Sequence, residues 1–412
     1  MKVLWLCNVP LPKISEVLSN KKALGGGWLV GASNSLINNN VELVVCYNEI
    51  FGTNEVDGEI DGIRYYSFNN KDNKTRFKNI LNDENPDVIH IWGTEYKHGY
   101  DMALLCKELG LIDKVIVDLQ GLTSVIYQHY TLGLPNSVVK SWTLRDFIKK
   151  DNIYYGKEKF KKRGIYEQQA LKIVKNVMGR TEWDYACSLR LNPTVNYYFC
   201  NRTLRDSFYN NERADSDIEK HSIFVSQCSY PVKGFHFVLD AMKDIIKKYP
   251  DAKLYTTGKS PFGLNFKEKL MQTSYNKYIG KLIKKYNLQN NVVFLGGLDE
   301  KSMCDRYKKS QVFVSASTIE NSPNSVAEAM ILGVPVVTSD VGGVKDYVEH
   351  NKSGYIYQTD APYMLAHYVC KIFEDYESTR DMINNAKIKA NELFNKENNC
   401  NRLIEIYNQI KK

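Results

Sequence analysis

Long hydrophobic runs are absent from this 412-residue sequence. Its apolar stretches fall well short of the ~18 residues that a membrane-spanning helix needs. The first of them, Val3–Cys7, is also too short for the hydrophobic part of a secretion signal, so we expect a strand there. These absences argue against an integral membrane protein. They predict a cytoplasmic chain, attached to a membrane surface at most.

Cysteine patterns that would indicate disulfides or zinc are also missing. The nine cysteines are odd in number, none forms C-x-x-C, and no Cys/His group has the spacing of zinc ligands. Several of them, such as Cys7 and Cys46, lie in apolar stretches. We therefore expect reduced, buried thiols in a cytoplasmic protein and no metal site.

Charge of one sign is not strongly dominant, since the net charge is +8. A mild basic excess suits polyanionic partners, but no nucleic-acid recognition motif is present, so we expect no nucleic-acid partner. The basic residues concentrate in 140–163, where nine Lys/Arg face three Asp/Glu among several aromatic residues. This segment is predicted either to contact an anionic membrane surface or to form a solvated loop and helix.

Short apolar runs alternate with helical patterns such as 98–109 and 163–175, which is typical of a parallel α/β sheet. The pattern restarts after the polar segment 205–221, a candidate linker. We expect two doubly wound domains, with ligands bound at the carboxyl ends of their strands. The expected strands are 2–7, 41–47, 62–68, 87–92, 114–119, 176–180 and 195–199, and then 222–227, 252–258, 291–297, 312–317, 334–339 and 353–358.

Two glutamates, Glu320 and Glu328, flank a predicted helix start that follows the strand 312–317. Pro323 fits the first helical position with Ser322 as its cap, and Gly333 fits the position just after the helix. A purely structural interpretation is available, because the spacing from Ser325 to Glu328 matches a capping box.

The alternative interpretation is a ligand site. Free N–H groups and the positive dipole end of a helix suit a phosphate. Glu328 could accept hydrogen bonds from a ribose diol, and Glu320 could hold a sugar hydroxyl on the other side of that phosphate. Two carboxylates around a phosphate site predict a receptor for a sugar nucleotide.

The segment from Glu320, "ENSPNSVAEAMILGVPVVTSDVGGVKDYVEH", resembles the signature of the family 4 glycosyltransferases of the GT-B fold. "VVFLGGLDEKSMCDRYKKSQVFVSAS" and "YPVKGFHFVLDAM" resemble two further segments of that family, so the likeness covers roughly 222–360. It implies two Rossmann-like domains facing across a cleft. The acceptor domain would be 1–207, with the C-terminal helix 388–412 crossing back onto it, and the donor domain 208–387.

The resemblance implies which residues act. Glu320 and Lys233 would be catalytic, with Lys233 also pairing with the donor diphosphate and Glu328 binding the ribose. The N-terminal stretch "LGGGW" fits a loop that closes over the diphosphate; it is not a dinucleotide fingerprint, and a loop without a ligand remains an alternative. The full donor-binding set would be Gly26, Gly27, Lys233, Gly258, Glu320, Asn321, Ser322, Pro323, Asn324, Ser325 and Glu328.

This sequence departs from the family in two places. Cys228 stands where the family usually has an Arg, and we expect Arg180 as a substitute. Gln120 stands where many members have a His. His90 and His98 lie near another strand end and are expected, with Gln120 and Arg180, on the acceptor side, although packing is the alternative for a lone His.

The predicted function is a retaining hexosyltransferase of surface polysaccharide biosynthesis. It would use a UDP- or GDP-linked sugar as substrate, a glycan or lipid-linked acceptor, and no cofactor. The only D-x-D, Asp215–Asp217, lies in the polar linker and is expected to be solvated, so a metal-independent reaction is predicted. The alternatives are a sugar-nucleotide epimerase, a phosphorylase, and a non-catalytic binding module on a membrane glycan-assembly complex.

Overall fold

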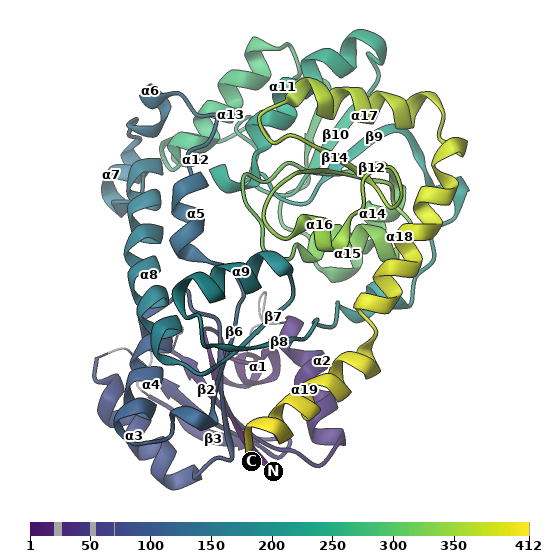
Figure 1. The fold of residues 1–412 in the computed structure, drawn as a ribbon. Coiled ribbons are helices and arrows are strands. Elements are labelled where there is room, and N and C mark those ends of the chain that lie inside the picture. Colours follow the sequence, from purple (N-terminus) through teal and green to yellow (C-terminus); the bar gives the residue numbers. More distant parts are fainter. Residues whose placement is uncertain (20–26, 50–54, 70, 412) are drawn as a thin grey trace. The chain divides into compact units, whose positions relative to one another are not determined.

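The computed structural model describes residues 1–19, 27–49, 55–69 and 71–411 (Figure 1). The chain forms two compact units. Unit 1 contains Met1–Ser124, Lys161–Arg205 and Phe394–Lys412, and unit 2 contains Val125–Phe160 and Asp206–Leu393. The expected boundary at 207 differs from the observed one by two residues. Two other expectations are corrected: 125–160 belongs to unit 2, and unit 2 extends to Leu393.

Unit 1 is built on an eight-stranded sheet in the order β3-β4-β2-β1-β5-β6-β7-β8, parallel except for β3. All seven predicted strands are present. The sequence did not indicate β3, because this hairpin strand has only four residues and Ile60 is its only large apolar side chain. The strands are β1 (Lys2–Cys7), β2 (Glu42–Asn48), β3 (Asp57–Ile60), β4 (Ile63–Phe68), β5 (Val88–Trp92), β6 (Val115–Asp118), β7 (Asn176–Gly179) and β8 (Asn196–Phe199).

The end of the chain completes the core of unit 1. Trp5 of β1 donates to the Tyr407 hydroxyl at 3.0 Å, and both side chains are fully buried. The single C-terminal helix expected at 388–412 is instead two helices, α18 (Arg380–Leu393) and α19 (Lys396–Lys411), and only α19 packs in unit 1. The other helices of unit 1 are α1 (Pro12–Ser19), α2 (Gly27–Asn38), α3 (Asn73–Glu84), α4 (Lys97–Glu108) and α9 (Glu182–Leu191).

Unit 2 is built on a fully parallel six-stranded sheet in the order β11-β10-β9-β12-β13-β14. Helices α11 and α17 lie over one face, and α14 and α15 lie over the other (Figure 1). The strands are β9 (Glu219–Val225), β10 (Lys253–Thr256), β11 (Val292–Phe294), β12 (Ser310–Ser315), β13 (Val336–Ser339) and β14 (Tyr355–Tyr357). The helices are α10 (Asp206–Tyr209), α11 (Phe235–Lys248), α12 (Phe266–Leu270), α13 (Ser274–Lys285), α14 (Glu300–Lys309), α15 (Asn324–Ile331), α16 (Val344–Tyr347) and α17 (Pro362–Glu374).

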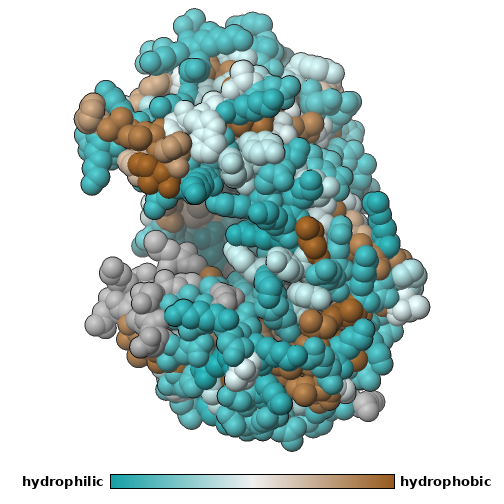
Figure 2. Space-filling view, turned by 90° about the vertical axis from the view of Figure 1, so that its left-hand side faces the viewer, coloured by the Kyte–Doolittle hydropathy of each residue, from teal (hydrophilic) through white to brown (hydrophobic). Residues whose placement is uncertain are grey.

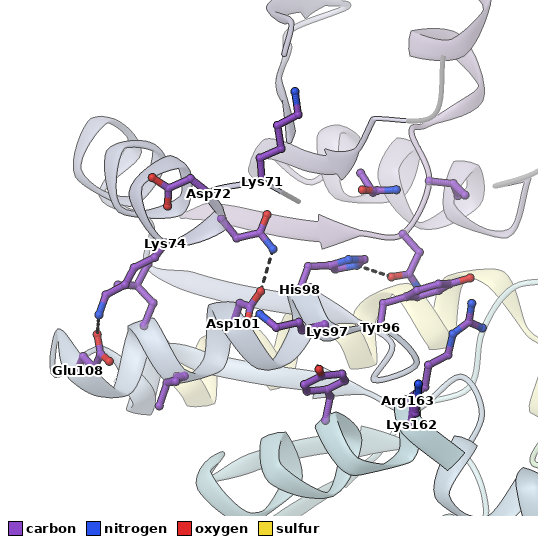
Figure 3. Close-up of a pocket in the computed structure, with 17 residues that line it drawn as sticks. Lys71, Asp72, Lys74, Tyr96, Lys97, His98, Asp101, Glu108, Lys162 and Arg163 are labelled. Carbon is purple, nitrogen blue, oxygen red and sulfur yellow. Dashed lines mark hydrogen bonds and ion pairs between the residues drawn. The ribbon is translucent and has the colours of Figure 1, made fainter. Parts of the chain in front are cut away.

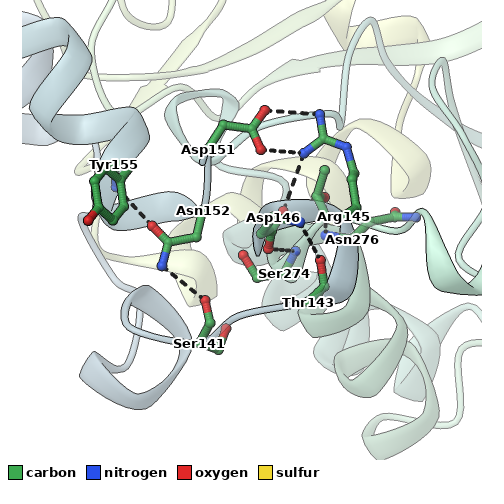
Figure 4. Close-up of polar contacts among 10 residues, drawn as sticks. Ser141, Thr143, Arg145, Asp146, Asp151, Asn152, Tyr155, Ser274 and Asn276 are labelled. Atoms are coloured by element: carbon green, nitrogen blue, oxygen red, sulfur yellow. Dashed lines mark hydrogen bonds and ion pairs between the residues drawn. The ribbon is translucent and has the colours of Figure 1, made fainter. Parts of the chain in front are cut away.

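Residues 125–160 join unit 2 through buried polar contacts. The ring of His236 on α11 lies 3.0 Å from the Leu132 carbonyl, and Asp146 accepts from the Ser274 N–H of α13 at 2.9 Å (Figure 4). These long-range partners explain why the sequence alone placed the segment in the first domain. Its helices are α5 (Thr123–His129), α6 (Asn136–Val139), α7 (Leu144–Lys149) and α8 (Ile153–Ile173), the last beginning ten residues before the expected helix at 163.

Candidate functional site

The strand order of unit 2 reverses direction between β9 and β12. In open parallel sheets, such a switch point leaves a crevice at the carboxyl ends of the two strands, where ligands bind. Lys233 follows β9 and Glu320 follows β12, so the topology places both residues at this point. The family resemblance implied that both residues act at the donor site, and unit 2 brings them together.

A backbone contact holds the two loops in register. The Thr318 N–H donates to the Val232 carbonyl at 2.8 Å, one residue before Lys233 and two before Glu320. The Lys233 ammonium then forms an ion pair with Glu320 Oε1, and Ser317 Oγ donates to the same oxygen at 2.7 Å. Ser317 was not among the predicted residues. Its position beside the first glutamate is the signal that could have found it.

Two glycines of the resembling segments allow this close approach. Gly234 has φ +62°, and a Cβ there would lie 1.8 Å from the Ala316 carbonyl oxygen. Gly342 has φ +51°, and its Cβ would lie 1.8 Å from the Glu320 carbonyl oxygen. Since only glycine tolerates both the φ and the contact, these positions fix the backbone next to Lys233 and Glu320.

The electrostatics of the pair keep Lys233 charged. Burial alone would lower its pKa, but the Glu320 carboxylate and the neighbouring Tyr230 outweigh that effect and raise the pKa above its usual value. The side chains of Lys233 and Glu320 remain 25% and 15% exposed. An anion that enters from solvent can therefore reach the ammonium.

The helix start after Glu320 differs from the expected one. Pro323 is the N-cap and Asn324 the first residue of α15, with no side-chain cap hydrogen bond, so Ser322 is not the cap. Glu328 is therefore the fifth helical residue, and the capping box with Ser325 is not formed. Gly333 follows the helix with φ +72°, as expected. The first N–H groups of α15 have no side-chain cap, as an anion-binding helix start requires.

Polar residues of this loop and of the first turns of α15 are buried. Asn321, Ser322 and Glu328 are 6%, 9% and 6% exposed. The buried Ser322 hydroxyl has no hydrogen-bond partner among the described residues. A buried hydroxyl without a partner is costly, and a ligand oxygen at this position would satisfy it.

Cys228 and Gly258 follow the carboxyl ends of the neighbouring strands β9 and β10. Gly258 has φ +115°, and a Cβ there would lie 2.8 Å from Cys228 Sγ. The thiol of Cys228 is buried and lies 3.0 Å from the Thr257 carbonyl oxygen. This position therefore supplies packing where the resembling family has a cation.

The remaining predicted donor residues, Gly26 and Gly27, belong to the N-terminal stretch "LGGGW". Gly26 falls outside the described residues, and Gly27 begins α2.

The D-x-D residues Asp215 and Asp217 are exposed in a short 3-10 helix, as expected, and Asp215 pairs with Arg380 at 2.8 Å.

The acceptor-side predictions divide into three cases in unit 1. His90 is wrong as a lining residue, because it is fully buried, stacks on Trp92 and lies 2.5 Å from the Tyr407 hydroxyl. Arg180 is buried and donates to the Leu119 carbonyl at 3.2 Å. Gln120 is half-buried and donates to the Trp92 carbonyl at 3.2 Å. Arg180 and Gln120 thus bind backbone carbonyls at the ends of β6 and β5. Their roles in ligand binding stay predictions.

His98 lines a pocket of about 780 Å³ in unit 1 (Figure 3). Its Nε2 lies 2.7 Å from Asn8 Oδ1, and its ring stacks on Tyr96 with centroids 5.5 Å apart. Burial lowers the pKa of His98 to about 4, so the ring is neutral at physiological pH. Asn8 and Tyr96 were not predicted, although each follows a predicted strand closely.

Glu95 follows the carboxyl end of β5. We expect it to make the free energy of unfolding depend on pH. Burial, helped by Glu167 and Asp118 and opposed by Arg202, raises its pKa from 4.5 to about 7. Between these values the unfolded chain releases the proton and the folded chain keeps it. The free energy of unfolding should therefore fall by up to about 3 kcal/mol as pH rises from 4.5 to 7, and stay level above.

Chemical denaturation at pH 5 and pH 8 tests this contribution. We expect Glu95→Gln to be more stable than the parent at pH 8 and close to it at pH 5, because the amide carries no charge to desolvate. Parallel pH profiles for the two proteins would contradict the assignment.

The chain is similar to known proteins in sequence and in fold. Residues 209–389 match the family model of glycosyl transferases group 1. Over 191 residues the chain is 27% identical to an uncharacterized glycosyltransferase of Methanocaldococcus jannaschii, covering 46% of this chain and 45% of that protein. The chain thus spans less than half the length of the curated relatives it matches.

Similar solved structures extend over the whole chain. Sucrose-phosphate synthase from Thermosynechococcus elongatus superimposes with a TM-score of 0.73 at 16% identity, covering 100% of this chain and 99% of that one. Anabaena HepE in complex with UDP-glucose gives 0.67 at 17% identity, covering 99% and 100%. At sequence identities of 16% and 17%, the similarity of these structures shows that the fold is shared. The chain has the GT-B fold, and its residues 209–389 match the group 1 glycosyltransferases.

Proposed function

We propose that this protein is a retaining, family 4 glycosyltransferase. It moves a hexose from a UDP- or GDP-linked donor to a glycan or lipid-linked acceptor of surface polysaccharide biosynthesis. The observation that carries the proposal is the Lys233–Glu320 pair at the switch point of the unit that matches the group 1 glycosyltransferases. The UDP-glucose complex of Anabaena HepE, which shares the fold, supports a nucleotide-sugar donor.

Each residue has a chemical role in this proposal. When the donor binds, its diphosphate competes with Glu320 for the Lys233 ammonium, and the released carboxylate accepts a hydroxyl of the sugar. The uncapped start of α15 and the Ser322 hydroxyl complete the phosphate contacts, and Glu328 binds the ribose. Lys233 and the helix dipole neutralise the leaving diphosphate, so we propose a reaction without a metal ion.

Nucleotide binding tests the donor site first. A thermal-shift panel of UDP, GDP and their common sugar conjugates should give a clear shift with one nucleotide, equal with magnesium and with EDTA. A ligand at ~100 times its dissociation constant adds about 2.7 kcal/mol of stability. Lys233→Ala should abolish the shift, and Lys243→Ala, which removes a partly exposed lysine of α11, should leave it unchanged. A chain that responds to no nucleotide would contradict the proposal.

The segment 140–163 supports a second part of the proposal, peripheral contact with an anionic membrane. Figure 2 shows a mostly hydrophilic face on which hydrophobic residues form separate groups. On α7 and its flanks the exposed apolar residues are Trp142, Leu144, Phe147, Ile148, Tyr154 and Tyr155, next to the exposed Lys140, Lys149 and Lys150. Apolar groups that enter the interface, ringed by lysines, suit an anionic bilayer. No helix in the described part of the chain is long and apolar enough to cross a membrane.

This surface is held in a fixed shape by polar contacts beneath it (Figure 4). Arg145 binds Asp151 with two hydrogen bonds of 2.7 and 3.0 Å, Thr143 caps α7, and the buried Asp146 anchors the segment to α13. The backbone that carries the exposed side chains is therefore already ordered, which lowers the entropic cost of binding.

Vesicle co-sedimentation should detect the contact. We expect binding to phosphatidylglycerol-containing vesicles, weak binding to pure phosphatidylcholine, and a loss of at least tenfold in affinity for Ile148→Ser. Ile388→Ser on α18 is a matched control, since the two isoleucines are 60% and 58% exposed. Equal losses in both variants, or no binding to anionic vesicles, would contradict this part of the proposal.

A further inference from the structure

The pocket of about 780 Å³ in unit 1 has a position that suits a ligand. It lies at the carboxyl ends of β1, β2, β4 and β5, where Asn8, Asn48 and the segments after β4 and β5 line it. The strand order of unit 1 reverses between β1 and β5, so this is also a switch point. Its volume matches a small-molecule site, such as one for one or two sugar rings.

The carboxylates of this pocket already have partners. Asp101 accepts from Lys97 at 2.6 Å and from Asn73 at 2.8 Å, and Glu108 pairs with Lys74 at 2.7 Å (Figure 3). Asp72 accepts from the Thr75 N–H at 3.1 Å as the N-cap of α3, which lowers its pKa. Two of the three negative charges are therefore balanced by lysines of the wall, and the third, on Asp72, is stabilised by a backbone N–H.

Positive charge remains in excess. The wall also contains Lys71, Lys162 and Arg163, and in the described part of the chain neither lysine forms an ion pair. The Arg163 guanidinium lies over the Tyr96 ring, 4.5 Å from its centroid, and Tyr96 is the N-cap of α4 without a side-chain cap hydrogen bond. A planar guanidinium beside an uncapped helix start is suited to a two-oxygen anion.

We infer that this pocket binds a sugar that carries an anionic group, either a phosphate or a carboxylate. The anion would lie between Arg163, Lys162 and the start of α4, and the sugar would extend along Tyr96 and Tyr166 toward Lys71. His98 is neutral and held by Asn8, so it shapes the wall without adding charge. That this sugar is the acceptor rests on the proposed function. The charge of the ligand rests on the pocket alone.

Calorimetric titration of the full chain tests the inference. The probes are glucose 6-phosphate, glucuronate and glucose. We expect at least tenfold tighter binding of one of the two anionic sugars than of glucose, and which one binds identifies the anion. Arg163→Gln and Lys71→Gln should each weaken it at least tenfold, and Arg163→Lys should retain part of the affinity. Lys78→Gln is the matched control, since Lys78 is exposed on α3 and does not line the pocket.

A second control separates this site from the donor site. Sugar phosphates could also bind Lys233, so the titration is repeated with Lys233→Ala, in which the affinity for the anionic sugar should be unchanged while nucleotide binding is lost. Loss of anionic-sugar binding in Lys233→Ala would overturn the inference, as would equal binding of glucose or no binding of either anionic sugar. Nucleotide binding by the parent chain reports on the proposed function independently of all these outcomes.

Discussion

Replacing Glu320 with alanine is expected to reduce sugar transfer by about 10²-fold or more while the protein stays folded. Glu320 contacts Lys233 and Ser317 at the strand edge where the donor sugar is proposed to lie. Removing one preorganised polar contact to a reacting group typically costs 10²–10³-fold in rate. Because Lys233 keeps access to water, the free energy of unfolding should change by only about 1 kcal/mol.

Transfer kinetics and thermal melting of Glu320→Ala measure the two effects separately. Glu377→Ala is a matched control, because Glu377 also pairs with a cation in unit 2 but is 73% exposed, and it should be fully active. An active Glu320→Ala enzyme would contradict the catalytic assignment. An inactive but fully folded variant that still binds nucleotide would place the role of Glu320 at the sugar and not at the base.

Replacing Glu167 with alanine is expected to destabilise unit 1 by about 3–5 kcal/mol. Glu167 lies fully buried on α8 and accepts from both the N–H and hydroxyl groups of Thr123 and Ser124, and from the Thr94 hydroxyl. Without the carboxylate these donors remain buried without partners, which is among the costliest results of a single substitution.

A drop of about 10 °C in the melting temperature of unit 1 corresponds to this loss. Glu405→Ala, at a 62% exposed position on α19 of the same unit, should change it by less than 2 °C. Similar melting temperatures for the two variants would contradict the structural role of Glu167. Since α8 also carries Arg163 and Tyr166, Glu167→Ala should weaken anionic-sugar binding as well.

The sequence predicted the strands well because they are fully buried. Parallel strands with helices on both faces appear as continuous apolar runs, as in Val312–Ser315, and these runs stand out from helical patterns. The exception was β3, which is polar. The family resemblance indicated the Lys233 and Glu320 loops, and the glycines at 234 and 342, which let the backbones approach closely, lie in the resembling segments.

Other predictions failed where a distant contact decides the structure. His90 looked like a lining residue because it lies near a strand end, but Tyr407, more than three hundred residues away, makes it part of the core. Pro323 looked like a first helical residue, but the loop that carries Glu320 places it one position earlier, as the N-cap. The segment 125–160 follows the first domain in sequence, yet Ser274 and His236 hold it on unit 2.

By itself the sequence determined the two largely parallel sheets, because burial and local spacing are properties of short stretches, and the resemblance of its segments to a family indicated the residues at the switch point of unit 2. Only the tertiary structure decided that α19 completes the first core, that 140–160 presents its aromatic side chains on unit 2, and that Arg163, Tyr96 and Lys71 line one pocket. These depend on which segments meet in space. A lysine or tyrosine that lines a pocket has the same local sequence pattern as one that faces water.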